Sequence, residues 1–118
     1  MDDKRMYILV NENIKISKGK LGGQIGHAVL TYAYYRTIKP LMNNEAYEDI
    51  TDYMEEQKKI LLSCPEEKLL EFEREGGYAV IRDKGYTELE PNTLTCVNYG
   101  IKTRSELPEW IKSLKLYH

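Results

Sequence analysis

Apolar residues along this chain fall into short runs and helical stripes that alternate with polar segments. Four of the runs are rich in residues that favour strands, which predicts four β-strands. They cover residues 6–11, 58–64, 78–83 and 94–101. Between the first two runs, apolar positions recur at helical spacing from Lys20 to about Ile38. We expect Pro40 to end that helix, because the residue before a proline is pushed away from helical geometry.

Further helices are predicted in the later part of the chain. Residues 43–57 are acidic and carry aromatic and apolar side chains at spacings typical of a short amphipathic helix. The segment from Pro65 to Gly76-Gly77 opens with a proline and acidic residues and closes on glycines, which are helix start and stop signals. Residues 105–117 have apolar positions at helical spacing, so a C-terminal helix is expected there.

The order of these elements predicts an α/β fold. Strands that alternate with helices are joined by crossovers, which favours a largely parallel sheet with helices on both faces. Residues 84–93 join the last two strands without a helical signal, so these strands can pair antiparallel and make the four-stranded sheet mixed. A chain of 118 residues is long enough for one compact domain, and we take residues 1–118 as a single domain.

Charge and composition narrow the class of protein. The net charge of −2 by itself argues against nucleic acid as a partner. Residues 1–39 are rich in lysine and arginine and residues 40–77 in acidic residues, which indicates either two oppositely charged faces or a solvated acidic surface. No apolar run could cross a bilayer, and no signal peptide is expected. Cys64 and Cys96 match no metal-site spacing and are expected to be reduced thiols in strands of a cytoplasmic protein.

The first candidate site lies in SKGKLGGQIGHA, residues 17–28. Lys20, Gln24 and His27 share one stripe of the predicted helix near its N-terminus, where free N–H groups and the helix dipole favour an anion. Lys18 adds positive charge. The segment, with its glycines Gly22, Gly23 and Gly26, is also explained by tight packing of the helix on the sheet, with the lysines at the surface. Its small neighbours favour a core role for His27 over a catalytic one.

The second candidate site lies in DKGYTELEPNTLT, residues 83–95. Asp83 ends a predicted strand, and ligands of α/β sheets gather at the carboxyl ends of strands. Thr87, Thr93 and Thr95 could supply hydroxyl groups. Alternatively, Asp83 forms an Asx turn and the threonines reflect strand propensity.

Together the two segments resemble the archaeal and eukaryotic type of peptidyl-tRNA hydrolase, a family distinct from the common bacterial enzyme. The family pattern is a strand followed by GKGKxAAQxxHA, and later a strand that ends in DAGxTxxxPxTxT. Here these read SKGKLGGQIGHA and DKGYTELEPNTLT. The resemblance extends to KKILLSCPEEKLLEF and to the closing LKLYH, and so spans nearly the whole chain. Gly22, Gly23 and Lys84 stand where the family has alanine.

The resemblance implies a fold and an activity. The fold is a four-stranded mixed sheet sandwiched by helices, and the activity is hydrolysis of the ester that joins a peptide to the 3′ ribose of tRNA. Neither a metal nor a cofactor is expected, the partner is peptidyl-tRNA, and the choice between a monomer and a homodimer is open. The residues that we expect to be catalytic are Lys20, Asp83, Thr87 and Thr95. The residues that we expect to bind substrate are Lys18, Gln24, His27 and Thr93.

Two other functions stay open from the sequence. A non-catalytic relative would bind a nucleotide or an RNA end at the same pocket, and a protein-interaction module would dock a basic partner on its acidic face. Retention of the residues that the family uses favours the enzyme, whereas the acidic excess favours the other two, because phosphate contacts dominate tRNA affinity. The catalytic hypothesis depends on Lys20 and Asp83 facing one pocket.

Overall fold

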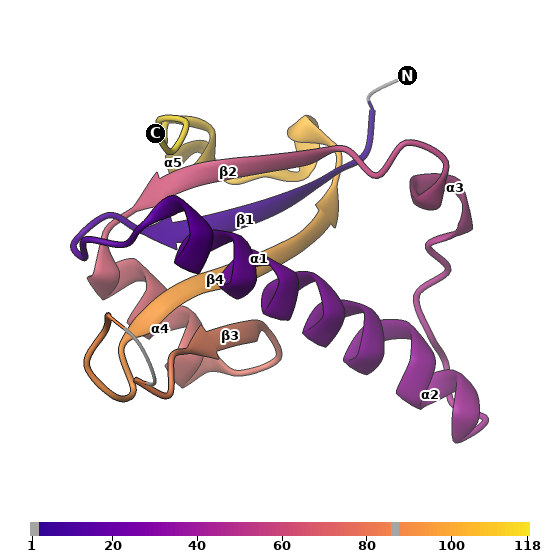
Figure 1. The fold of residues 1–118 in the computed structure, drawn as a ribbon. Coiled ribbons are helices and arrows are strands. Elements are labelled where there is room, and N and C mark those ends of the chain that lie inside the picture. Colours follow the sequence, from indigo (N-terminus) through magenta and orange to yellow (C-terminus); the bar gives the residue numbers. More distant parts are fainter. Residues whose placement is uncertain (1–2, 86–87) are drawn as a thin grey trace.

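The computed structural model describes residues 3–85 and 88–118, and among them four strands form one sheet in the order β2-β1-β4-β3 (Figure 1). The strands are β1 (Arg5–Asn11), β2 (Lys59–Cys64), β3 (Ala79–Arg82) and β4 (Leu94–Lys102). β1 and β2 run parallel, whereas β4 pairs antiparallel with both β1 and β3. The mixed α/β sheet is confirmed. The expectation of a largely parallel sheet is wrong, because β4 follows β3 without a crossover helix and turns back along it.

Helices cover both faces of the sheet, as expected (Figure 1). α1 (Lys18–Ala33) crosses one face, and α4 (Glu66–Glu75) and α5 (Glu109–Lys112) lie on the other. Successive side chains of a strand point to opposite faces, so the buried strand β1 supplies both cores. Ile8 and Val10 pack in the core beneath α1, and Tyr7 and Leu9 pack in the core beneath α4 and α5.

The first helix continues through Pro40, so the expected end before this proline is wrong. A π-helical turn (Tyr34–Ile38) follows α1 and leads into α2 (Lys39–Met42). Pro40 has no N–H to donate back along this continuous helix, and the Arg36 carbonyl four residues before it accepts the Glu48 N–H at 2.9 Å instead. The resulting arm extends beyond the edge of the sheet (Figure 1).

The acidic segment 43–57 is largely irregular rather than an amphipathic helix. Its helical part is only α3 (Thr51–Met54). Tertiary contacts hold the rest: the Tyr32 hydroxyl donates to the Glu48 carboxylate at 2.6 Å, and the Glu48 N–H donates to the Arg36 carbonyl at 2.9 Å. These bonds to the long helix replace the bonds that a continuous helix over 43–57 would have made.

The C-terminal segment is also less helical than expected. It forms a 3₁₀ turn (Arg104–Glu106) and the single-turn α5, and then becomes extended. The Ser63 N–H donates to the Lys115 carbonyl at 2.8 Å, and the Tyr117 N–H donates to the Leu61 carbonyl at 2.9 Å. The backbone after α5 therefore pairs with the edge of β2 instead of continuing a helix.

Both cysteines are free and buried in strands, as predicted. Burial raises the pKa of the Cys64 thiol and of the Cys96 thiol to about 12 in each case. Both thiols are therefore protonated and unreactive at neutral pH. Within residues 3–85 and 88–118, no helix combines the length and the apolar character needed to span a membrane.

Candidate active site

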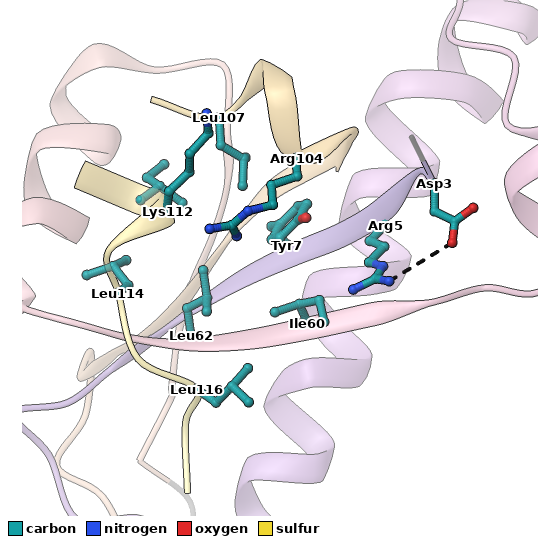
Figure 2. A pocket seen from close by; sticks show the side chains of 11 residues that line it. Asp3, Arg5, Tyr7, Ile60, Leu62, Arg104, Leu107, Lys112, Leu114 and Leu116 are labelled. Carbon is teal, nitrogen blue, oxygen red and sulfur yellow. Dashed lines mark ion pairs between the residues drawn. The ribbon is translucent and has the colours of Figure 1, made fainter. Parts of the chain in front are cut away.

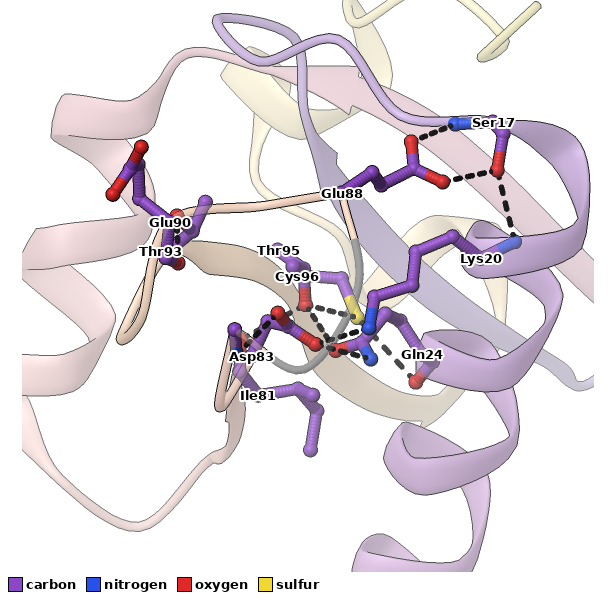
Figure 3. Close-up of polar contacts among 11 residues, drawn as sticks. Ser17, Lys20, Gln24, Ile81, Asp83, Glu88, Glu90, Thr93, Thr95 and Cys96 are labelled. Carbon is purple, nitrogen blue, oxygen red and sulfur yellow. Dashed lines mark hydrogen bonds and ion pairs between the residues drawn. The ribbon is translucent and has the colours of Figure 1, made fainter.

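Lys20 and Asp83 meet at one end of the sheet, although they are far apart in the sequence (Figure 3). Lys20 lies in the first turn of α1, and Asp83 directly follows β3. The Lys20 Nζ atom is 2.6 Å from Asp83 Oδ1, and the two side chains are only 16% and 5% exposed. The juxtaposition on which the sequence hypothesis depends is therefore present.

A buried chain of hydrogen bonds runs from Thr95 through Gln24 to the carboxylate of Asp83 (Figure 3). The Thr95 hydroxyl lies 3.0 Å from Gln24 Oε1, to which it can donate, and Gln24 Nε2 donates to Asp83 Oδ1 at 3.3 Å. The Thr95 hydroxyl also lies 3.0 Å from the Ile81 carbonyl. Gln24 and Thr95 are 4% and 0% exposed, so this chain is fixed in the interior and orients the carboxylate of Asp83.

The environment of Asp83 keeps its carboxylate ionised. The hydrogen bond from Lys20 holds the pKa of Asp83 below its ordinary value of 3.8, against the opposing effect of burial. The Gly85 N–H also donates to Asp83 Oδ2 at 2.7 Å, which is the Asx-type bond considered from the sequence. Gly85 has a φ of +79°, and a Cβ atom there would lie 2.7 Å from Pro91 Cα. The turn therefore requires glycine.

The start of α1 is tied to the loop between β3 and β4. Ser17 caps the helix, because its hydroxyl oxygen accepts the Lys20 N–H at 3.3 Å. Glu88 accepts hydrogen bonds from the Ser17 hydroxyl at 2.6 Å and from the Ser17 N–H at 2.9 Å (Figure 3). These contacts hold the loop that carries Asp83 against the helix that carries Lys20.

An open pocket of about 470 Å³ lies beside the ion pair. It is lined by Lys20, Gln24, His27, Thr31, Val80, Ile81, Arg82, Asp83 and Lys84. His27 is exposed on its wall, so the interpretation of His27 as a core histidine is wrong. The helix packs on the sheet through a different stripe, which includes Ala28 and Tyr32, and this turns His27 toward the pocket.

The glycines of α1 face open space. A Cβ atom built at Gly22, Gly23 or Gly26 would have nothing within 4 Å. Tight packing of these glycines on the sheet, the alternative considered from the sequence, is therefore wrong. The physical reason is that all three lie on the side of α1 opposite the buried stripe of Gln24, Ala28 and Tyr32.

The remaining predicted residues are placed less centrally. Lys18 is exposed at the start of α1. The Thr93 hydroxyl donates to the Glu90 carbonyl at 2.7 Å inside the loop and is not joined to the Lys20–Asp83 pair. Thr87 lies outside the described residues. The structure thus gathers Lys20, Gln24, His27, Asp83 and Thr95 and leaves Lys18 and Thr93 at the margin.

A second pocket, of about 580 Å³, lies on the face of the sheet that α4 and α5 cover (Figure 2). Its floor is apolar and includes Tyr7 and Leu62, and Arg5, Arg104 and Lys112 are at its walls. None of the described residues that the sequence assigned to a site lies in it. The polar cluster beside Lys20 is therefore the better candidate for chemistry.

Comparison with known proteins settles the family. Residues 4–117 match the family described as peptidyl-tRNA hydrolase PTH2. The chain belongs to this family. A peptidyl-tRNA hydrolase of Haloquadratum walsbyi is 34% identical, over 96% of this chain and 99% of the relative. That of Staphylothermus marinus is 35% identical, over 95% of this chain and 93% of the relative. That of Methanopyrus kandleri is 36% identical, over 87% of this chain and 89% of the relative. The resemblance seen in the two sequence motifs is confirmed.

Two residues that shape the site in this member of the PTH2 family were not found from the sequence. Glu88 and Ser17 join the loop to the helix, and their hydrogen bonds link residues that are distant along the chain. Ser17 three residues before Lys20 was a detectable N-cap signal. No local signal identifies its partner Glu88, because the contact exists only after the sheet has formed.

Proposed function

We propose that this chain hydrolyses the ester between a peptide, or an N-blocked amino acid, and the 3′ ribose of tRNA, and so releases free tRNA. The relatives that carry the name peptidyl-tRNA hydrolase support this activity over the binding-only alternative. The single observation that carries the assignment to this pocket is the 2.6 Å contact between Lys20 and Asp83. An ammonium and an ionised carboxylate at one pocket are suited to ester hydrolysis.

In the proposed reaction, Asp83 orients the attacking water. Its Oδ1 atom accepts from Lys20 and Gln24, whereas its Oδ2 atom accepts only the Gly85 N–H among the described residues and retains a lone pair. Because the pKa of Asp83 is lowered, its carboxylate is better suited to orienting the water than to accepting a proton. The water oxygen bonds to the ester carbonyl carbon, the bond to ribose O3′ breaks, and the proton ends on that oxygen.

Lys20 stabilises the negative charge that develops on the carbonyl oxygen in this proposal. Its ammonium is already held in place by Asp83, so little reorganisation is needed when the charge appears. This positive charge lets the reaction proceed with water and without a bound metal. Gln24 and Thr95 act as positioning residues, since the fully buried Thr95 reaches the site only through Gln24.

The other predicted residues keep proposed roles. Thr87 is proposed as catalytic from the family pattern, and Lys18, His27 and Thr93 are proposed to bind substrate, with His27 on the pocket wall as the best supported. We further propose that residues 1–118 act as one domain in the cytoplasm, which agrees with two unpaired thiols. Exposed apolar residues on the arm, such as Leu41 and Met42, would support a homodimer.

The proposed function is tested by turnover of an N-acetyl-aminoacyl-tRNA. We expect Lys20→Met and Asp83→Asn each to lower kcat by about 100-fold or more, because each removes a preorganised charge from the reacting centre. The matched control is Lys112→Met, which removes a lysine that is paired with Glu109 at 3.3 Å on the other face. This control should retain full activity.

Circular dichroism and thermal unfolding establish that each variant is folded. The proposal is wrong if the wild-type protein hydrolyses the ester no faster than the Lys20→Met/Asp83→Asn double variant. Equal loss in the Lys112→Met control would show that the effect is not local to this pocket.

A further inference from the structure

A groove extends the candidate pocket along the outside of the sheet. Another cavity, of about 730 Å³, adjoins the candidate pocket on the same side of the molecule, and the two share Thr31 and Val80 on their walls. This adjoining cavity is lined by Thr31, Tyr32, Tyr35, Arg36, Gly77, Tyr78, Ala79 and Val80. The two cavities together therefore form one groove that ends at the Lys20–Asp83 pair.

The groove follows the main chain of β3 rather than one face of the sheet. Its lining residues run consecutively over 77–84. Tyr78 and Val80 pack toward the core beneath α4, whereas Ala79 and Ile81 pack toward the core beneath α1. A cavity that touches residues of both faces lies along the edge of the strand. β3 is the last strand in the sheet order, and among the described strands it pairs with β4 alone, so its outer edge can accept another strand.

The opposite wall of the groove is a single stripe of the long helix. The residues on this stripe are Lys20, Gln24, His27, Thr31 and Tyr35. They recur every three or four positions, so the helix wall runs beside β3 from the ion pair to Tyr35. The groove is polar at the Asp83 end and aromatic at the Tyr35 end.

The aromatic end offers little to a phosphate. Its one cation among the lining residues is Arg36. The Arg36 guanidinium donates to the Gly77 carbonyl at 2.9 Å and lies 5.7 Å from the centre of the Tyr32 ring. Arg36 is thus engaged within the protein, which favours an uncharged, peptide-like occupant over the backbone of an RNA.

We propose that this groove binds the peptide part of peptidyl-tRNA as an added strand parallel to β3, an inference that rests on the proposed function. The ester carbonyl belongs to the last residue of the peptide, and it must lie at Asp83, at the carboxyl end of β3. The preceding residues then extend along the strand toward Gly77. Peptide and strand therefore run in the same direction, and at about 3.3 Å per residue the groove beside β3 holds about four residues.

Strand addition explains how one site can accept peptides of different sequence. An added strand is held mainly by main-chain hydrogen bonds, which every residue except proline can make. The cavity beside Tyr35 and Tyr78 has a volume of about 730 Å³, which leaves room for side chains of different size. The groove would thus select for the presence and length of a peptide rather than for its sequence.

The first test varies the peptide. Wild-type protein is given tRNA that carries one to six residues with a blocked N-terminus, and kcat/KM should rise up to about four residues and then stay constant. Single N-methylations should lower kcat/KM about threefold to tenfold at every second position only, because alternate residues of an added strand point their N–H toward the partner. Equal effects at all positions would overturn strand addition.

The second test uses two neighbouring tyrosines whose rings lie 5.1 Å apart. Tyr35 lines the groove and Tyr34 does not. Tyr35→Ala should reduce the ratio of kcat/KM between the four-residue and one-residue substrates, whereas Tyr34→Ala should leave this ratio unchanged. Equal ratios in both variants and in wild type would overturn the proposal. It would also be overturned if Tyr35→Ala lost affinity for deacylated tRNA and this loss accounted for the whole effect on kcat/KM, because the groove would then bind RNA.

The two proposals fail in different ways. If wild-type protein does not hydrolyse even N-acetyl-aminoacyl-tRNA, the proposed function is wrong and the groove proposal falls with it. If it hydrolyses this substrate with the same kcat/KM as the four-residue substrate, the proposed function stands and the groove does not bind the peptide.

Discussion

At the scale of single residues, Asp83 shows how a carboxylate is kept charged although it is almost completely buried. Three donors converge on it: the Lys20 ammonium, the Gln24 amide and the Gly85 N–H. The Lys20 ammonium, with help from the Gly85 N–H, outweighs the desolvation that would raise the pKa of Asp83. The same contacts that keep Asp83 charged therefore also stabilise the fold at neutral pH.

This linkage predicts a pH-dependent stability difference between wild type and Asp83→Asn. The folded pKa of Asp83 lies below its ordinary value of 3.8, so the carboxylate adds stability that is fully present above that value. The added stability should decline as the pH falls and vanish below the folded pKa. Urea unfolding between pH 7 and about pH 2.5 measures the difference. This account would be contradicted if the stability difference between wild type and Asp83→Asn grew on acidification. It would also be contradicted if Asp83→Asn changed stability by the same amount in a Lys20→Met background.

At the scale of elements, α1 has three sides with three tasks. One side packs on the sheet through Ala28 and Tyr32, and a second carries the polar stripe of the pocket. The third side presents glycines to open space, where neither packing nor backbone conformation requires them. We propose that Gly23, which borders the pocket stripe, leaves room for close approach of the tRNA end.

Gly23→Ala should stabilise the protein by about 0.5–1 kcal/mol, because alanine loses less conformational freedom in a helix and nothing lies in the way of its methyl group. Gly85→Ala is the contrasting variant and should be clearly destabilised, since its φ is +79° and Pro91 occupies the space. Urea unfolding measures both. Destabilisation by Gly23→Ala would show that this side of α1 is not open. If Gly23→Ala instead gains stability but loses affinity for tRNA, close approach of the tRNA to this side is supported.

At the scale of the whole molecule, the distribution of charge matters more than its sum. The net charge is −2, yet Lys18, Lys20 and Lys84 all lie around the carboxyl end of β3 and the start of α1. The acidic segment is held away from this end, because Glu48 is bonded to Tyr32 in the last turns of α1. Asp83 and Glu88 lie at the same end, so the three lysines leave it a small positive excess, which can attract a polyanion to an acidic protein.

Lys18→Ala should weaken binding of deacylated tRNA, and the salt dependence of the affinity should become shallower by about one unit of slope. The matched control, Lys112→Ala, removes a charge from the other face and should change neither quantity. Binding titrations at several salt concentrations provide the measurement. An unchanged slope in Lys18→Ala would mean that Lys18 contacts no phosphate.

Much of the architecture could be predicted from the sequence, because it depends on local patterns. The four strands, α1 and α4 carry strong hydrophobic periodicity and clear start or stop signals, and they form close to where these signals place them. The two motifs also identified the family, and their stripe of Lys20, Gln24 and His27 follows from helical spacing alone.

Tertiary structure decided the features that depend on what each surface meets. The segment after α5 has helical spacing but pairs with β2, and residues 43–57 are amphipathic but are bonded to the long helix, since partners outside these segments satisfy their backbone better. His27 is exposed because packing of α1 selected another stripe for the core. The distance between Lys20 and Asp83 likewise exists only once β3 is the edge of the sheet beside α1, because no local pattern encodes a contact between distant segments.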